Sequence, residues 1–173
     1  MFIDIRELER DKLEFQERFA PGRINLGNDA SLAETLETEG AAELIDSDIR
    51  LRGHLRTAVE TACARCLEPA HQPVEKDFDL YYRPVQTIAR EEEVEIDDAE
   101  LEVGFYQGHG LLLEDALREQ VLLDLPMKIL CQPDCKGLCP QCGKDLNAGP
   151  CGCAPVTEAR WQPLKALKDK LRS

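Results

Sequence analysis

Eight cysteines, most of them in close pairs, constrain the fold of this 173-residue chain more than any other feature. Six of them lie between Cys131 and Cys153, where the only large apolar side chains are Leu138 and Leu146. Burying two leucines contributes at most about 6 kcal/mol, whereas ordering each residue of that stretch costs about 1–2 kcal/mol. The stretch therefore needs a further source of stability, and structural zinc provides about 10–16 kcal/mol in small cysteine-rich folds.

The spacing of the cysteines indicates the kind of metal. Zinc takes four thiolates in closed structural sites, and two cysteines separated by two residues can reach the same ion. Cys63 and Cys66 have this spacing, and so do Cys139 and Cys142. Disulfide frameworks belong to exported chains, and residues 1–12 carry charge where a signal peptide would have an apolar core. We expect a cytoplasmic protein with two Zn²⁺ ions in tetrathiolate sites.

All eight cysteines are candidate metal ligands, and two ways of dividing them are open. The preferred division gives each ion two close pairs. Its first site holds Cys63, Cys66, Cys131 and Cys135, and its second site holds Cys139, Cys142, Cys151 and Cys153. The alternative is one local site of Cys131, Cys135, Cys139 and Cys142, which leaves the other four cysteines to pair.

Two loaded sites would change the charge of the chain. Each zinc with four thiolates carries −2, so the formal charge of −13 would become about −17. Three basic residues lie within two positions of a cysteine in the sequence, namely Arg65, Lys136 and Lys144. We expect them to soften the added charge and to donate hydrogen bonds to sulfur.

Alternating apolar residues predict strands on both sides of the first cysteine pair. From residue 49 to residue 63 apolar side chains alternate with arginine and histidine, and the period of two resumes between Val74 and Tyr82. The two strands would form a hairpin whose turn is a metal-binding knuckle at 63–66.

The pattern as a whole predicts an α+β fold that is predominantly antiparallel β, with a C-terminal zinc-knuckle segment and one or two packing helices. We expect two parts. Residues 1–126 would form a β-rich domain that carries the first knuckle, and residues 127–173 would form the zinc-binding segment and a C-terminal helix.

Helical patterns occur in three places. Residues 29–40 resemble a short helix, with Asp29 or Ser31 as its N-cap and a glycine as its end. Residues 111–124 have apolar side chains at intervals of three and four, which predicts an amphipathic helix that the following proline ends. A last helix is expected over 161–171. Short strands are expected near residues 2–5 and 101–105.

The acidic balance of the chain bears on its partners. Residues 91–102 hold eight acids and no base, which is typical of a solvated loop. An acidic surface repels phosphate backbones and suits a basic partner such as a ribosomal protein. Contact with RNA would involve the basic C-terminal tail or the strand face that carries Arg50, Arg52 and Arg56. The alternative for that face is that its arginines are solvated and paired with nearby acids. No apolar run reaches the roughly 20 residues that a membrane span needs.

Several motifs, in this order, resemble those of the YceD family. They are Cys63-Ala-Arg-Cys66-Leu67, Leu125-Pro126, Cys135-Lys136-Gly137-Leu138-Cys139-Pro140-Gln141-Cys142-Gly143, Leu146-Asn147, Cys151-Gly-Cys153 and Trp161-x-Pro163-Leu164-x-x-Leu167-Lys168. The resemblance implies a bacterial protein needed for the accumulation of large-subunit ribosomal RNA, with relatives in chloroplasts. Its partners would be that RNA or its precursor particle, and a basic ribosomal protein is a further candidate. Some family members lack most of the C-terminal cysteines, which implies a stabilising role for the second site.

Two functional classes follow from these observations. The first is a non-enzymatic binding factor in large-subunit biogenesis. The second is a metal-dependent or thiol-redox enzyme that uses the Cys-x-x-Cys pairs. Four cysteines leave no open position for water on a metal, and the three histidines, His54, His71 and His109, fit no catalytic spacing. Iron–sulfur ligation is an alternative for the second cysteine group. We expect no catalytic residue, no small-molecule substrate and no membrane partner.

Overall fold

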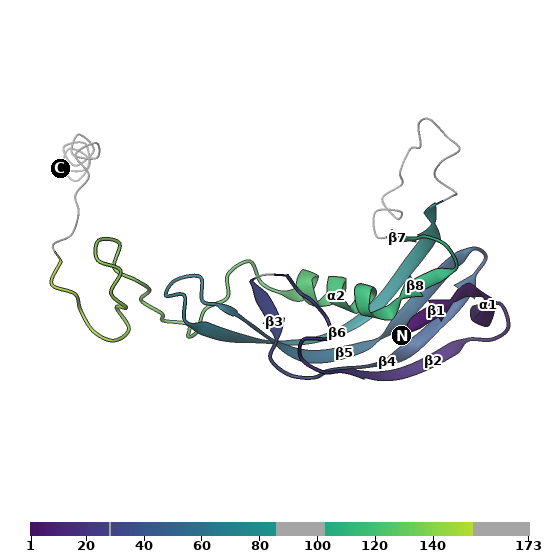
Figure 1. Cartoon of the computed structure of the whole chain (residues 1–173), viewed down its shortest axis with the longest axis horizontal. Helices are drawn as coiled ribbons and strands as arrows, with labels where there is room; N and C mark the ends of the chain where they lie inside the picture. Colours follow the sequence, from purple (N-terminus) through teal and green to yellow (C-terminus); the bar gives the residue numbers. More distant parts are fainter. Residues whose placement is uncertain (28, 86–102, 154–173) are drawn as a thin grey trace, which may run out of the picture.

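The computed structural model describes residues 1–27, 29–85 and 103–153 (Figure 1). Its strands are β1 (Phe2–Asp4), β2 (Leu13–Phe19), β3 (Ala30–Leu32), β4 (Leu36–Ile45), β5 (Asp48–Ala62), β6 (Pro69–Pro84), β7 (Val103–Tyr106) and β8 (Gly110–Leu112). Its helices are α1 (Ile5–Leu8) and α2 (Leu113–Asp124). The described part of the chain is therefore mostly sheet with few helices, as the sequence predicts.

Six strands form the main sheet, in the order β2-β4-β5-β6-β7 with β3 paired to β5 (Figure 1). Strands β2 to β6 pair antiparallel, whereas β7 runs parallel to β6. Strands β1 and β8 form a separate antiparallel pair. The predominantly antiparallel character is confirmed; the parallel pairing of β7 is a feature that the local pattern does not reveal.

The hairpin of β5 and β6 is the longest feature of the sheet. The two strands stay in register from the pair Ile49 and Tyr82 to the pair Ala62 and Pro69. The predicted alternation is confirmed, because Leu51, Leu55 and Val59 are fully buried on one face of β5. The cysteine knuckle therefore lies at the far end of a long, well-anchored hairpin.

Helix α2 covers one face of the sheet (Figure 1). The buried side chains of α2, which include Leu113, Leu117 and Val121, belong to the same core cluster as Val74 and Phe78 of β6. The helix ends at Asp124, and the next residue is extended, ahead of a proline. Proline restricts the residue before it to extended conformations, so the predicted helix end is confirmed.

The expected helix over 29–40 is wrong. Residues 30–32 form β3 and residues 36–45 form β4. Leu36, Thr38 and Ala42 are buried at alternate positions of β4, so the true period is two. The alanine, leucine and glutamate of this stretch favour helix only weakly, and pairing with β5 on one side and β2 on the other outweighs that preference.

Two glycines face each other in the middle of the sheet. Gly40 of β4 pairs with Gly53 of β5, and the rings of Phe15 and Phe78 lie beside them. A methyl group at either glycine would collide with a carbonyl of the neighbouring strand. This close approach explains why glycine interrupts the apolar alternation at residue 53 without ending the strand.

Several expected features fall outside the described residues. The acidic run of 91–102 and the helix expected over 161–171 are among them. Of the helices that are described, none has the length and apolar character needed to cross a membrane.

Candidate metal centres

The first cluster of cysteines joins two distant parts of the chain. Strand β5 ends next to Cys63, the following turn supplies Cys66, and the segment after α2 supplies Cys131 and Cys135. The four sulfur atoms lie within 4.8 Å of one another. The sulfurs of Cys63 and Cys135 are 3.8 Å apart, and those of Cys66 and Cys131 are 3.5 Å apart. Three of these cysteines are buried, and Cys131 is exposed.

The second cluster is local in sequence and more open to solvent. It contains Cys139, Cys142, Cys151 and Cys153, again within 4.8 Å of one another. The sulfurs of Cys139 and Cys151 are 3.3 Å apart. Only Cys139 is buried. The eight sulfur atoms thus gather in the two groups of the preferred division, and the alternative grouping of Cys131 and Cys135 with Cys139 and Cys142 is not found.

The two knuckles share one backbone turn. The amide of Leu67 donates to the carbonyl of Cys63 at 3.0 Å, and the amide of Gly143 donates to the carbonyl of Cys139 at 2.9 Å. In both turns the residue after the second cysteine has a left-handed backbone, with φ of 65° at Leu67 and 70° at Gly143. Glycine adopts this conformation without steric cost, whereas leucine does not.

The geometry of both clusters fits a tetrahedral thiolate site. A zinc–sulfur bond of about 2.3 Å places the corners of a tetrahedron about 3.8 Å apart. The sulfur separations of 3.3 to 3.8 Å are close to this edge. They are well beyond the roughly 2.05 Å of a disulfide bond, and all eight cysteines are free thiols. Either cluster could therefore hold a metal ion.

Backbone amides stabilise the thiolate form of one cysteine in each cluster. Burial raises the pKa of Cys63, but amides of Arg65, Cys131 and Cys66 point at its sulfur and lower the pKa overall to about 6. At Cys139 the amides of Cys142 and Gln141 likewise lower the pKa to about 6. Hydrogen bonds from N–H groups favour the charged sulfur.

At least one other thiol in each cluster has a raised pKa. Contact with the sulfur of Cys66 raises the pKa of Cys131 to about 12, and contact with Cys142 raises the pKa of Cys153 to about 12. Several thiolates cannot share so small a volume without a cation, because their charges repel. A divalent ion would remove this repulsion and displace the protons.

The groups around the sulfurs differ in part from those expected. The side chain of Asn147 donates to the sulfur of Cys135 at 3.4 Å. Arg65 instead donates from its side chain to the carbonyl of Cys135 at 2.6 Å, and Lys144 donates to the carbonyl of Pro150 at 3.1 Å. The expectation that these side chains bond to sulfur is wrong for both residues. Asn147 belongs to the Leu146-Asn147 motif, but its spacing from the cysteines does not indicate which sulfur it would reach.

A small apolar cluster supports the first centre. Cys63, Cys66, Ala70 and Cys135 are packed together, with Ile129, Leu130 and Leu138 against them. The amide of Ala64 donates to the carbonyl of Ile129, and that of Leu138 donates to the carbonyl of Arg65. The segment that carries the cysteines is therefore tied to the end of the hairpin by backbone bonds as well as by sulfur.

Comparison with known proteins agrees with this arrangement of motifs. The family model described as "Large ribosomal RNA subunit accumulation protein YceD" matches residues 51–168, which is more than half of the chain. The chain belongs to the YceD family. The match includes both knuckles and all eight cysteines.

Relatives of this YceD-family chain occur in bacteria and plants. An uncharacterized protein of Mycobacterium tuberculosis is 32% identical over 130 residues, which cover 75% of this chain and 60% of that protein. A maize protein named "Large ribosomal RNA subunit accumulation protein YCED homolog 1, chloroplastic" is 29% identical over 69% of this chain and 48% of its own length. This chain thus spans about half to three-fifths of these relatives. No solved structure matches it at a significant level.

Arg50, on the arginine face of β5 in this YceD-family chain, is paired with acids. The guanidinium of Arg50 lies 2.7 Å from Asp79 and 3.4 Å from Glu43, and it stacks over the ring of Tyr81. Hydrogen bonding to Arg50 lowers the pKa of Asp79, and Asp79 raises the pKa of Arg50. Pairing of this kind leaves little positive charge for an RNA phosphate.

Acids also lie opposite other basic residues of β5 in the register of the sheet. Cross-strand rows on this face run Arg18–Glu37–Arg56–Glu75 and Gln16–Glu39–His54–Asp77. Acids from β4 and β6 thus lie on both sides of Arg56 and His54, and Arg52 has Asp79 of β6 on one side. The C-terminal tail, the other surface considered for RNA, lies outside the described residues.

Proposed function

We propose that this YceD-family chain is a zinc-stabilised, non-enzymatic factor in the biogenesis of the large ribosomal subunit. It would support accumulation or processing of large-subunit ribosomal RNA by binding RNA or a ribosomal protein. The observation that carries the proposal is the presence of two four-cysteine centres in a chain whose plant relatives are named for accumulation of that RNA. The site of action would be the cytoplasm, where bacterial ribosomal subunits are assembled.

Zinc is the metal that the donor set favours. Four thiolates and no oxygen donor suit a soft or borderline ion in a tetrahedral site. Cys63, Cys66, Cys131 and Cys135 would hold one ion, and Cys139, Cys142, Cys151 and Cys153 would hold the other. Zinc would supply a redox-inactive crosslink between thiolates. Residues 1–126 would then be a β-rich domain, to which the first ion fastens the segment from residue 127 onward.

The closed donor sets support binding over catalysis. A catalytic zinc keeps a position open for water or substrate, and four protein sulfurs close the tetrahedron. Of the three histidines, His54 lies between Asp77 at 2.8 Å and Glu75 at 3.8 Å, and His71 lies 3.5 Å from Glu60. The rings of His54 and His71 contact carboxylates on the sheet surface, and none of the three histidines belongs to a cysteine cluster.

The charge of the sheet supports a protein partner over RNA at the surfaces described. A basic ribosomal protein complements an acidic face, whereas an RNA phosphate would meet glutamates and aspartates beside every arginine of β5. RNA remains a candidate for the parts of the chain that lie outside the described residues.

The metal part of the proposal is tested by composition and coordination. Reduced protein purified without added metal is expected to contain two zinc ions per chain, each with four sulfur ligands in X-ray absorption spectra. Three sulfurs with an exchangeable water at either ion would contradict the closed site and revive the enzyme alternative. Removal of both ions by a chelator is expected to abolish hydrogen-exchange protection in residues 139–153.

The biological part is tested in a bacterial strain depleted of its own YceD protein. Expression of this chain is expected to restore the ratio of large-subunit to small-subunit ribosomal RNA, and a matched Cys139→Ser variant shows whether the second centre is needed. If depletion leaves this ratio unchanged, or if the wild-type chain does not restore it, the proposed function is wrong.

A further inference from the structure

Leu67, at the tip of the β5–β6 hairpin, has an unusual combination of features. Its backbone is left-handed, with φ of 65°, and its side chain is 67% exposed. A left-handed backbone is unfavourable for a bulky residue, and exposure means that the leucine gains little from packing. The corresponding residue of the second knuckle is Gly143, which adopts the same turn without strain. The turn therefore does not require a leucine.

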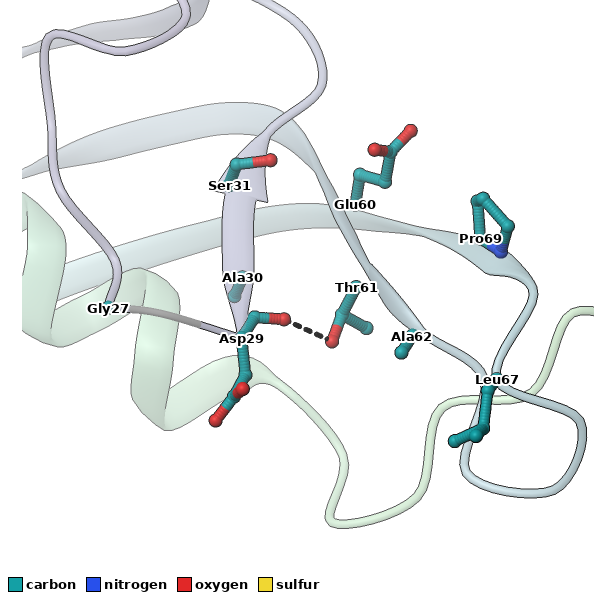
Figure 2. A pocket seen from close by; sticks show the side chains of 9 residues that line it. All are labelled: Gly27, Asp29, Ala30, Ser31, Glu60, Thr61, Ala62, Leu67 and Pro69. Carbon is teal, nitrogen blue, oxygen red and sulfur yellow. Dashed lines mark hydrogen bonds between the residues drawn. The ribbon is translucent and has the colours of Figure 1, made fainter.

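A pocket lies beside this leucine. Its volume is about 310 Å³, and it lies between β3, the end of β5 and the start of β6, with Leu67 at its rim (Figure 2). The hydroxyl of Thr61 donates to the carbonyl of Asp29 at 2.6 Å, which holds β3 against β5 at the base of the pocket. The pocket is open to solvent, and its volume is at the lower limit of ligand pockets. It could therefore hold one or two amino-acid side chains.

The charge at this pocket selects the kind of partner. Asp29 and Glu60 are the ionisable residues that line it, and no lysine or arginine is among the lining residues. Glu68, which follows the leucine, is exposed and adds a third acid. Among the described residues, the one ion pair made by these three acids is that of Glu60 with His71, at 3.5 Å. A phosphate backbone would be repelled here, whereas a protein segment with lysine or arginine next to an apolar side chain would complement both the leucine and the acids.

We propose that Leu67 and the pocket between β3 and β5 form a docking site for a basic protein segment that carries an apolar side chain. The inference rests on the proposed function and deepens it by stating where the chain binds and which class of partner it takes. The leucine would act as the apolar contact, and Asp29 and Glu60 would receive the basic groups.

The substitution Leu67→Gly separates a binding role from a structural one. Glycine relieves the left-handed backbone, so the variant should keep both metals and unfold at the same or a higher temperature than the wild type. A leucine needed for the fold would give the opposite result. Leu123→Ser is the matched control, because Leu123 is 73% exposed on α2 and does not line this pocket.

Binding is measured with defined probes. A synthetic peptide in which lysine alternates with leucine is expected to shift the NMR signals of Leu67, Ala30 and Thr61, and to bind roughly tenfold more weakly to Leu67→Gly. Leu123→Ser should bind as the wild type does. A lysine–serine peptide should bind more weakly than the lysine–leucine peptide. Failure of the lysine–leucine peptide to bind, or equal binding to Leu67→Gly, would overturn the proposal.

Other occupants give different results. If a uridine oligonucleotide binds and Leu67→Gly weakens it, the site takes RNA and the proposal is wrong. If sedimentation shows a dimer that Leu67→Gly dissociates, the occupant is a second copy of this chain, and the proposal is again wrong.

In the depleted strain, Leu67→Gly should fail to restore ribosomal RNA although it is folded, whereas Leu123→Ser should restore it. Full restoration by Leu67→Gly would contradict the proposed docking site but not the proposed function. Failure of the wild-type chain to restore ribosomal RNA would contradict the proposed function.

Discussion

Each of the two candidate centres consists of four cysteines, but the two depend on different parts of the chain. The first centre joins residues that are 65 to 72 positions apart, as in the pairs Cys66 with Cys131 and Cys63 with Cys135. The second centre closes a short loop, with Cys139 and Cys151 only 12 positions apart. The first is built on the end of a long hairpin and a small apolar cluster, whereas the second has little beyond its own turns.

Because the two centres differ in their surroundings, each metal ion would support a different part of the fold. Without its ion, the first centre still has two ligands held by β5 and β6, and backbone bonds from Ala64 and Leu138 keep the cysteine-rich segment near them. The second centre has an isolated bridge between Leu138 and Asp145 and a bond from the Cys139 amide to the Lys144 carbonyl. We infer that the fold of the second centre depends almost entirely on its metal ion. The first centre also connects the second centre to the sheet.

Loss of one ligand from each centre is expected to produce the largest effect. Cys63→Ser should remove the first ion and expose the hairpin tip together with the segment that packs against it, because Cys63 is fully buried there. Cys139→Ser should remove the second ion and release only residues 139–153. Native mass spectrometry should find one zinc in each variant, and hydrogen exchange should show the wider loss of protection in Cys63→Ser. The middle of β5 should stay protected in both.

A control distinguishes loss of a ligand from loss of packing. Cys142 is exposed, whereas Cys139 is buried, yet Cys142→Ser should behave as Cys139→Ser does if thiolate ligation is what holds the loop. Loss of both ions from Cys139→Ser would contradict the inference that the first centre retains its ion when the second centre loses its own.

Lowering the pH should release zinc from the second centre before it releases zinc from the first. Both Cys63 and Cys139 have a pKa of about 6, below the ordinary thiol value of 9.0. A folded-state pKa below that of the unfolded chain means that the thiolate favours the fold, so this contribution is lost as the pH falls through about 6. Zinc release, followed with a chromophoric chelator from about pH 7.5 to about pH 4.5, should come first from the more exposed second centre. Release from Cys139→Ser, which retains only the first ion, should begin at a lower pH.

The sequence predicts the hairpin and both centres because the relevant signals are local. Alternate apolar residues define β5 and β6, and two close cysteine pairs per ion define the division of ligands. The helix expected over 29–40 is wrong because the alanines, leucines and glutamates there favour helix only weakly. The period of two of Leu36 and Thr38 becomes clear only when β4 is paired. The parallel pairing of β7 with β6 joins residues about 22 positions apart, such as Tyr81 and Val103, and no local pattern encodes it.

Asn147 is the point at which the second loop reaches the first centre. It lies between Cys142 and Cys151 in sequence, yet its amide group donates to the sulfur of Cys135 and its oxygen accepts from the amide of Lys136 at 2.8 Å. Asn147→Ala should weaken zinc binding at the first centre by about tenfold, a typical effect of losing a hydrogen bond to a metal ligand. Chelator competition measures this change. Gln132→Ala, which removes only a surface contact to Asn147 at 3.3 Å, is the control and should have little effect.

The smallest expected effect tests the shared turn of the knuckles. Gly143 has φ of 70°, and a methyl group there would meet no atom within 4 Å, so Gly143→Ala introduces backbone strain without a clash. The expected cost is about 1 kcal/mol, or roughly fivefold in zinc affinity at the second centre. Gly152→Ala is the matched control, since Gly152 is equally open but is not left-handed. Equal affinities for the two variants would mean that the turn tolerates a side chain freely, and the leucine at position 67 of the first knuckle would then carry no strain to explain.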